Sequence, residues 1–437
     1  MSKKFRYLLI ILGVVVFVVS APLIVFFVRG VKYDFKEKKF VSTGILAIKS
    51  DPKDADVYLD GVLAKNSSGE IRFLEPKNYL VTLKKDGYRQ WEKTLTVLPD
   101  KVVWISPENG KIQLLLDNQA PQKLAQGVVD FVLWPGRLIS LNSKELVFSN
   151  SLGLETVEKF SLPKDASKIL ASANYKYFLL TKEASKESPS HVLWFDLPQK
   201  KLFDLKTLFE TANLPLPIFD LSGEGELFAL LEDNLYRINV ENSSKQLLLS
   251  KISGFKIFEK TLYYLVKEEK GLALIAKDLE TGEALKLQGG LPELNAPEII
   301  INSQKRIFIA AEASIYSVKE AGLSKLAENL TEWDLEEIDE NLSYATSGEL
   351  WYADAVGNTN FVTRTSENIS LPEIRKNLGY ALFVEDNKIK ALELDRRSRQ
   401  NTYELYIAKN IQKYKLDEDS RQLFILDDGT LKRLKIR

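Results

Sequence analysis

The sequence predicts an all-β fold that follows one N-terminal transmembrane helix. Three observations lead to this prediction. An uninterrupted apolar run occupies residues 7–28, alternating residues and tight turns occupy residues 44–105, and strand-like segments recur from residue 111 to the C-terminus. No long amphipathic helix pattern interrupts the last two regions, so both are expected to be built from strands alone.

The composition is that of a globular protein, and it excludes several functional classes. Of the 437 residues, 45% are hydrophobic and 27% are charged, and Lys+Arg and Asp+Glu both number 60. This balance gives no electrostatic reason to expect nucleic acid as a partner. The chain has no cysteine, which excludes disulfides and thiolate chemistry, and its one histidine, His191, cannot form a multi-histidine metal site. We therefore expect no metal and no cofactor.

The apolar run Tyr7–Val28 carries no charged residue. About 20 such residues cross a bilayer core of about 30 Å as a helix. A cleaved signal peptide is the alternative, because Val19-Ser20-Ala21 resembles a cleavage site. However, Pro22 follows directly, and the run is longer than the roughly 7–15 residues of a signal-peptide core. The sequence therefore predicts an uncleaved signal anchor.

The predicted orientation places residues 1–6 in the cytoplasm and the bulk of the chain outside it. A bare count of Lys and Arg favours the reverse, because residues 29–39 are more basic than the tail. However, a short basic tail before a first anchor normally stays inside, and long domains translocate largely regardless of flanking charge. The expected order is a cytoplasmic tail at 1–6, a transmembrane helix at 7–28, a linker at 29–43, a β-sandwich at 44–105 and a repeated β domain at 107–437.

The stretch that follows the linker reads as short strands between tight turns. The strand Asp56–Leu59 alternates polar and apolar residues, and it lies between Asp51-Pro52 and Asp60-Gly61. Proline fixes φ, Asp accepts hydrogen bonds from turn amides, and Asp-Gly is a strong signal for a tight hairpin turn. Similar strands continue to residue 105, which predicts a small antiparallel sandwich of about six strands.

This stretch resembles the PEGA domain in the order and spacing of its turns. That family is named for a Pro-Glu-Gly-Ala turn before a strand that ends in Asp-Gly, with a Gly-Tyr turn further on. Lys53 and Asp54 replace two letters of the turn, and Asp tolerates the positive φ of the glycine it replaces. The resemblance implies an extracytoplasmic β module of surface and envelope proteins, with no catalytic role. The residues that carry the structural motif are Pro52, Ala55, Asp60, Gly61, Gly87 and Tyr88.

From residue 111 onward, an often aromatic strand recurs at intervals of mostly about 35–50 residues, near the period of a four-stranded propeller blade. Apolar segments such as 226–231 and 306–311 precede it, as expected for strands buried on both faces. The region resembles a β-propeller of the WD-repeat-like or quinoprotein kind, and seven or eight blades are expected. Stacked β-sandwiches remain the alternative. The recurring strands are 144–148, 191–196, 234–238, 271–275, 314–318, 349–353, 403–407 and 429–434.

The two ends of the repeated region are expected to meet. The chain ends in a strand at 431–436, with no residues left for a further outer strand. The apolar segment 111–116 precedes the first unit and has no obvious partner. Unpaired edges invite aggregation, and rings of blades commonly close by pairing their ends. We therefore predict that residues 111–116 complete the last blade, formed by residues 413–436.

Three features are candidate sites, and each has an ordinary structural interpretation. His191 opens a strand without a recognisable nucleophile motif elsewhere, so we expect a strand-edge surface residue. The acidic stretch Glu332–Glu340 lacks the spacing of a calcium loop and is expected to be a solvated loop or edge. The basic turn Arg396–Arg399 is expected to be a hairpin tip, the alternative being a contact with acidic lipid or polymer. We therefore predict no catalytic residue.

Two functional hypotheses follow. The first is a membrane-anchored extracytoplasmic binding or scaffolding protein, with the propeller as interaction platform and the PEGA-like module as spacer. Its partners are the lipid bilayer, through residues 7–28, and an unknown envelope protein or polysaccharide. The alternative is a cell-envelope carbohydrate-active hydrolase that uses propeller carboxylates, although a fold alone does not license a reaction. A deep acidic pocket on the propeller axis would favour the hydrolase.

Overall fold

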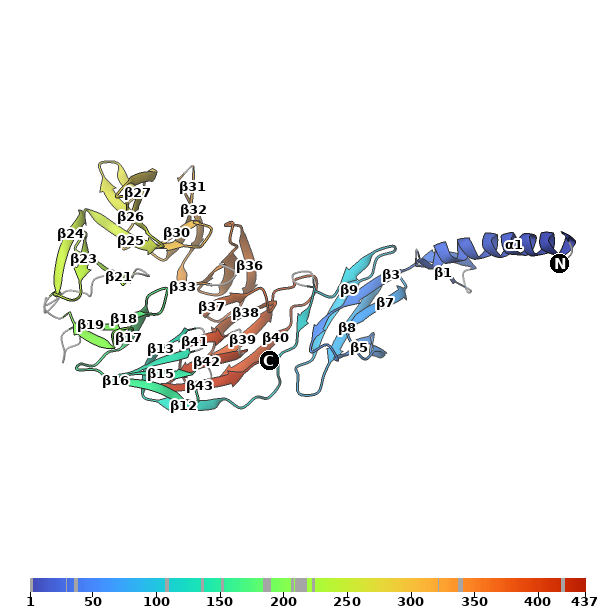
Figure 1. The fold of residues 1–437 in the computed structure, drawn as a ribbon, viewed down its shortest axis with the longest axis horizontal. Coiled ribbons are helices and arrows are strands. Elements are labelled where there is room, and N and C mark those ends of the chain that lie inside the picture. Colours follow the sequence, from blue (N-terminus) through green and yellow to red (C-terminus); the bar gives the residue numbers. More distant parts are fainter. Residues whose placement is uncertain are drawn as a thin grey trace.

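The computed structural model describes residues 3–437, except 29, 35–37, 107–109, 135–136, 151–152, 184–189, 206–207, 209–217, 222–224, 321, 337–340 and 418–420. One helix, α1 (Lys3–Val28), precedes a ribbon of two antiparallel strands, β1 (Val31–Asp34) and β2 (Lys39–Ser42). A small β domain and then a large ring of sheets follow, and the helix lies at the end of the molecule far from the ring (Figure 1).

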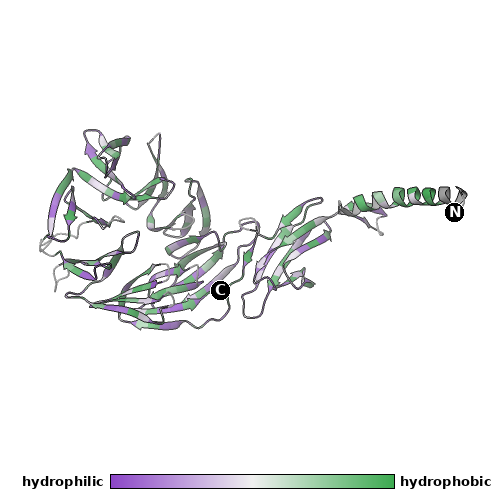
Figure 2. Ribbon diagram, in the orientation of Figure 1, coloured by the Kyte–Doolittle hydropathy of each residue, from purple (hydrophilic) through white to green (hydrophobic). Residues whose placement is uncertain are grey.

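Hydrophobic residues run along α1, whereas hydrophobic and hydrophilic residues are mixed along the strands of both domains (Figure 2). Among the residues that the structure describes, no helix has the length and apolar character needed to cross a membrane. The predicted transmembrane span at residues 7–28 is thus not supported by this finding.

The small domain is the predicted sandwich. Its two main sheets have the strand orders β6-β5-β8-β9 and β10-β3-β7. Trp91, Val81 and Leu46, all with 0% exposure, lie in the core between them. The sandwich is not wholly antiparallel, because β10 pairs parallel with β3. Its strands are β3 (Gly44–Ile48), β4 (Ser50–Asp51), β5 (Asp56–Leu59), β6 (Val62–Lys65), β7 (Gly69–Leu74), β8 (Asn78–Lys84), β9 (Trp91–Thr96) and β10 (Val102–Trp104).

The turn between β5 and β6 has the geometry that Asp-Gly predicts. Asp60 has φ 49° and Gly61 has φ 82°, as in a two-residue turn of type I′. The Asp60 carboxylate accepts hydrogen bonds from the Leu80 amide at 2.9 Å and from Lys77 at 2.8 Å. Asp54 does not need the positive φ that the sequence suggested for it. Its carboxylate instead pairs with Lys85 at 2.7 Å and ties its loop to the loop after β8.

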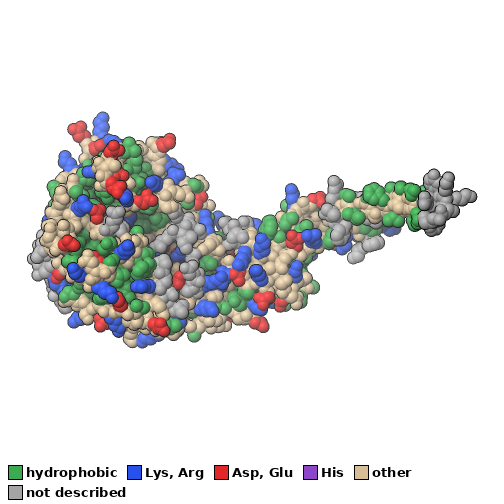
Figure 3. Space-filling model, viewed as in Figure 1, with side chains coloured by type: hydrophobic (Ala, Val, Ile, Leu, Met, Phe, Trp, Pro, Cys, Tyr) green, Lys and Arg blue, Asp and Glu red, His purple; other side chains and the backbone are tan. Residues whose placement is uncertain are grey.

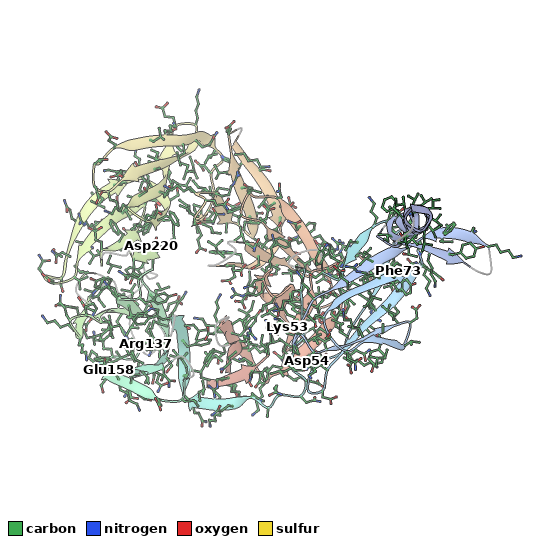
Figure 4. The ribbon with its side chains drawn as sticks, turned by 45° about the vertical axis from the view of Figure 1, so that its right-hand side comes forward. Lys53, Asp54, Phe73, Arg137, Glu158 and Asp220 are labelled. Carbon is green, nitrogen blue, oxygen red and sulfur yellow. The ribbon has the colours of Figure 1, made fainter. Side chains whose placement is uncertain are left out.

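The second domain consists, within the described residues, of eight four-stranded antiparallel sheets, which form a ring (Figures 1 and 4). The first strands of several neighbouring sheets contact one another, which indicates that the first strand of each sheet is the inner one. The strands Leu227–Leu231 and Ile307–Ala311 are apolar and almost entirely buried, as predicted for 226–231 and 306–311. The eight sheets are the blades of a β-propeller, at the upper end of the predicted seven or eight.

Blades 1 to 4 are formed by β13 (Val128–Trp134), β14 (Arg137–Asn142), β15 (Glu145–Asn150), β16 (Thr156–Ser161); β17 (Lys168–Ala171), β18 (Tyr177–Lys182), β19 (His191–Asp196), β20 (Lys201–Asp204); β21 (Ile218–Leu221), β22 (Leu227–Leu231), β23 (Asn234–Asn239), β24 (Ser244–Ser250); and β25 (Ile252–Phe258), β26 (Thr261–Glu268), β27 (Gly271–Asp278), β28 (Ala284–Leu291).

Blades 5 to 7 are formed by β29 (Glu298–Ile301), β30 (Ile307–Ala311), β31 (Ser314–Lys319), β32 (Gly322–Glu328); β33 (Leu330–Leu335), β34 (Leu342–Thr346), β35 (Glu349–Ala353), β36 (Thr359–Arg364); and β37 (Ser370–Arg375), β38 (Tyr380–Glu385), β39 (Lys388–Glu393), β40 (Thr402–Ile407). Blade 8 combines β41 (Ile411–Asp417), β42 (Gln422–Asp427) and β43 (Thr430–Lys435) with β12 (Gln122–Gln126) from the start of the domain.

The ring does close by pairing its two ends, but not through residues 111–116. The outer strand of blade 8 is β12, which pairs antiparallel with β43. Within 111–116, strand β11 (Ile112–Gln113) pairs parallel with β4 of the small domain, so the predicted closing strand is wrong. The segment is apolar because both domains bury it: Leu114 lies in the core of the small domain and Leu115 in the core of blades 7 and 8.

Buried charges join the small domain to blade 7. Lys93 of β9 has no exposed side-chain surface, and its Nζ lies 3.0 Å from Glu393 Oε2 and 3.4 Å from Asp395 Oδ2. Trp91 Nε1 donates to Glu393 Oε1 at 2.9 Å. Burial raises the pKa of Asp395, but hydrogen bonds from Arg397 and the charge of Lys93 outweigh this effect, so that the pKa is lowered. Asp395 therefore remains a charged partner of Lys93.

The basic turn between β39 and β40 completes this junction. Arg397 donates to the backbone oxygens of Trp104 at 2.7 Å and Ile105 at 2.5 Å. Its guanidinium also binds Asp395 at 2.7 Å. Arg396–Arg399 is therefore more than the predicted hairpin tip, because Arg397 holds the small domain in place. A domain joined by paired buried charges and by the shared segment 111–116 forms one body with the ring.

Candidate functional site

The inner strands of the propeller carry many charged residues, and these form the candidate site. In Figure 4, Asp220 lies on the inner rim of the ring. Charges of both signs surround the axis, so the site is neither an acidic nor a basic funnel. The charged residues of the described inner strands are Asp130, Lys168, Asp220, Lys256, Glu298, Glu332, Asp334, Glu373, Arg375, Lys413, Lys415 and Asp417.

Three of the carboxylates each bind the backbone of the next blade. Asp130 Oδ2 accepts the Ile169 amide at 3.0 Å, and Asp220 Oδ2 accepts the Ile257 amide at 2.7 Å. Glu332 accepts the amide of Leu371 in the same way. These bonds join blades 1 and 2, 3 and 4, and 6 and 7. Their repetition indicates that these carboxylates stabilise the ring.

Lysines of the inner strands bind the carboxylates of Asp130, Asp220 and Asp334. Lys413 binds Asp130 Oδ1 and the carbonyl oxygen of Phe131, both at 2.7 Å, and so joins blade 8 to blade 1. Lys256 lies 3.2 Å from Asp220 Oδ1. Lys415 lies 2.7 Å from Asp334 Oδ2, and although burial lowers its pKa, the charges of Asp334 and Glu373 raise it overall.

The acidic stretch is not the solvated loop that the sequence suggested. Glu332 and Asp334 lie on β33, the inner strand of blade 6. Glu336 is 3% exposed, and it binds Arg375 at 3.1 Å and Asn341 at 3.0 Å. Glu336 is buried and Glu332 and Asp334 are half-buried, because the inner strand of a propeller faces the other blades as well as the axis. Glu337, Asp339 and Glu340 lie outside the described residues.

Glu298, the first residue of β29, differs from the other carboxylates. Solvent reaches its side chain, yet the protein around the axis desolvates it and raises its pKa. The charges of Lys256 and Lys168 partly oppose this effect, whereas that of Asp220 adds to it. Glu373 also has a raised pKa, but it is only 2% exposed and is bound to Arg375. Glu298 is therefore the axial carboxyl group best placed to meet a ligand.

A cavity of about 470 Å³ lies between the inner strands of blades 6, 7 and 8. Trp333, Asp334, Glu373, Tyr414 and Lys415 are among its lining residues. Within the described residues, no group of three or more acidic or histidine side chains could hold a metal ion. The cavity thus combines aromatic rings with charges that already have protein partners.

His191 is not the surface residue that the sequence suggested. It is 8% exposed at the start of β19, and its Nε2 donates to the carbonyl oxygen of Asp165. The prediction was wrong because β19 is a central strand whose six residues are all buried. A buried ring that donates to a backbone carbonyl fits a structural role.

The motif residues of the small domain lie in its core and in its turns. Ala55 is fully buried in the core, and Tyr88 packs against the same core. Gly87, at φ 79°, lies in a turn at the end near the propeller, where Tyr88 bridges to Leu116. Sequence reasoning missed Glu298, Asp220 and Asp130 as inner-strand acids. The sequence feature that could have identified them is a single acidic residue within an otherwise apolar strand, as in Val128–Trp134.

The comparisons with known proteins agree with this architecture. Residues 43–109 match the PEGA domain model. A search of curated protein sequences finds no match. A eukaryotic initiation factor structure aligns with a TM-score of 0.50 at 11% identity, over 71% of this chain and 86% of that one.

Two other solved structures align with lower scores. Dipeptidyl peptidase 4 of Porphyromonas gingivalis gives a TM-score of 0.47 at 10% identity, over 70% of this chain and 56% of that one. PorZ is described as a bacterial surface component of the type-IX secretion system of the same organism. It gives a TM-score of 0.41 at 12% identity, over 70% of this chain and 42% of that one. On the family match and the eight four-stranded sheets of the described residues, the chain contains a PEGA domain at residues 43–109, followed by an eight-bladed β-propeller.

Proposed function

We propose that this chain is a membrane-anchored extracytoplasmic binding or scaffolding protein, and that it is not an enzyme. The PEGA domain fits an extracellular or envelope protein. The observation that carries the proposal is the junction between the two domains. Because Lys93, Glu393 and Asp395 are buried there as paired charges, the PEGA domain holds the propeller in one orientation as a rigid spacer. Such an arrangement suits a platform that presents its surface to an envelope protein or polysaccharide.

The apolar run Tyr7–Val28 supports the anchor. The structure describes the α1 side chains of residues 9–22, 24 and 25. In the sequence, the apolar run extends beyond these residues on both sides. Twelve large apolar side chains of α1 are 44–70% exposed. In the space-filling view, hydrophobic side chains follow the described part of the helix, whereas charged side chains are scattered over the two domains among hydrophobic and other atoms (Figure 3). A helix that is hydrophobic all round and uncovered by its own protein needs an apolar environment, and a bilayer provides one.

The orientation can be tested directly, because the chain has no cysteine. Ser366→Cys introduces one exposed thiol on the propeller, and Ser2→Cys introduces one in the N-terminal tail. We expect a membrane-impermeant maleimide to label Ser366→Cys in intact cells and Ser2→Cys only after lysis. The protein should also stay in the membrane fraction through alkaline carbonate washing. Labelling of Ser366→Cys only after lysis would refute the extracytoplasmic orientation, and release by carbonate would refute the anchor.

One observation favours the hydrolase as a second candidate. A glycosidase pairs a carboxylic acid of raised pKa with a second carboxylate that stays ionised. Glu298 has a raised pKa, and Asp220, which binds Lys256 and the Ile257 amide, is close enough to influence that pKa. Hydrolysis of an envelope glycan by the wild-type chain, and its loss in Glu298→Gln, would establish this function. An inactive wild-type chain across cell-wall glycans would leave the binding function preferred.

A further inference from the structure

We propose that the β1–β2 ribbon is an interfacial anchor, which lies in the headgroup region of the bilayer and binds anionic phospholipid headgroups. The inference rests on the proposed membrane anchoring of α1 and adds to it a second contact with the lipid. The surface consists of the aromatic pair Tyr33 and Phe40 and the exposed lysines Lys32, Lys38 and Lys39.

The aromatic pair lies on one face of the ribbon. Tyr33 and Phe40 are directly opposed residues of β1 and β2, so both side chains point to the same side. Their rings meet edge to face, with centroids 5.1 Å apart. Tyr33 is 37% exposed and Phe40 is 58% exposed. Two large rings on an exposed ribbon are costly in water, and aromatic rings are enriched where a membrane meets water.

The position of the ribbon identifies the bilayer as the partner. β1 begins at Val31, close behind the last residue of α1, Val28, and it contacts α1. Within the described residues, β1 and β2 pair only with each other, so the ribbon is not part of a sheet of the PEGA domain. The Thr43 amide binds the Gly30 carbonyl at 3.0 Å, which returns the chain to the base of the ribbon. If α1 spans the bilayer, the ribbon therefore lies at the level of its headgroups.

The charges on the ribbon fit an anionic surface. Lys32, Lys38 and Lys39 are all exposed, and residues 31–42 carry four lysines against two acids, Asp34 and Glu37. Lysines next to a membrane segment are attracted to anionic lipid headgroups. Their long side chains can extend along the ribbon and reach the phosphates while the rings insert among the upper acyl chains. A protein partner would not need this combination to coincide with the end of an apolar helix.

Fluorescence quenching in nanodiscs tests the inference with the full-length chain. The six native tryptophans all lie in the two β domains, so they form a constant background. Phe40→Trp keeps an aromatic ring on the ribbon, Phe17→Trp reports on α1, and Tyr316→Trp on blade 5 is the control outside the membrane. Each variant is measured in nanodiscs of phosphatidylcholine and phosphatidylglycerol that carry bromine near the headgroup or deep in the acyl chains.

We expect shallow bromine to quench Phe40→Trp more than deep bromine, deep bromine to quench Phe17→Trp most, and neither to quench Tyr316→Trp beyond background. Replacing all three lysines by glutamine should reduce quenching of Phe40→Trp in anionic nanodiscs. Quenched Phe17→Trp with unquenched Phe40→Trp would overturn the ribbon inference and leave the anchor standing. Absence of quenching at both positions would overturn the anchor as well. Quenching of Phe40→Trp that is unaffected by lysine replacement would overturn the headgroup-binding part.

Discussion

Replacing Lys93 by methionine tests whether the junction holds the two domains together. The substitution keeps the length of the side chain but removes the cation that lies 3.0 Å from Glu393 and 3.4 Å from Asp395. These carboxylates are only 4% and 5% exposed, so solvent cannot replace the lost partner. Removing one member of a buried ion pair costs about 3–5 kcal/mol. Arg397 still binds Asp395, and Trp91 still binds Glu393, so we expect the lower end, about 3 kcal/mol.

Urea unfolding, followed by tryptophan fluorescence and by circular dichroism, measures this loss. We expect one transition for the wild type and a lower midpoint for Lys93→Met. Adding Glu393→Gln should recover part of the loss, because glutamine removes the unpaired charge and can still accept the Trp91 hydrogen bond. Lys77→Met, which breaks the exposed pair with Asp60, is the matched control and should leave the midpoint almost unchanged. A Lys93→Met loss below about 1 kcal/mol would refute the reasoning.

Three further predictions concern the β domains. Burial raises the pKa of Asp427, but hydrogen bonds from the Asn410 amide, Lys432 and Tyr406 lower it overall to about 2. At a pH above its unfolded pKa of 3.8, this carboxylate therefore stabilises the folded state by about 2 kcal/mol, and this stabilisation is lost as the pH falls toward 2. In an acid-unfolding experiment, Asp427→Asn should remove this pH-dependent part of the unfolding free energy. Gly61→Val places a β-branched residue at φ 82°, where no neighbouring atom lies within 4 Å of its Cβ, so backbone strain alone should lower the unfolding free energy by about 1–3 kcal/mol; an unchanged denaturation midpoint would contradict this. Replacing residues 122–126 by a Gly/Ser linker should lower the melting temperature of the whole propeller in calorimetry, whereas an unchanged main transition would show that β12 does not close the ring.

The elements that the sequence predicted well are those whose local pattern reflects their own surroundings. Asp60-Gly61 forms the expected turn because its conformation depends on two residues. Strands β22 and β30 are buried, as their continuous apolar runs indicate. The PEGA resemblance was carried by turns of this kind, and the family comparison confirms it over residues 43–109.

The errors arose where distant contacts decide the structure. The closing strand Gln122–Gln126 is mostly polar because it is the outer strand of its blade, so it gave no strand signal. Residues 111–116 are apolar because two domains bury them, and not because they close a blade. The acids of β33 resemble a solvated loop in sequence, but partners from blades 7 and 8 bury or pair them. Arg397 is an exposed turn residue, as its sequence suggests, but its guanidinium binds the backbone of a second domain, which the local sequence does not reveal.

The central claim is that the PEGA domain and the propeller form one rigid body. Asn66→Cys on the PEGA domain and Ser366→Cys on the propeller are exposed sites for a pair of nitroxide labels in an otherwise cysteine-free chain. Pulsed electron–electron double resonance of the full-length protein in nanodiscs then gives the distribution of distances between the two labels. We expect a single narrow distance that broadens when Lys93→Met is introduced. A broad distribution of distances in the labelled protein that keeps Lys93 would contradict the claim.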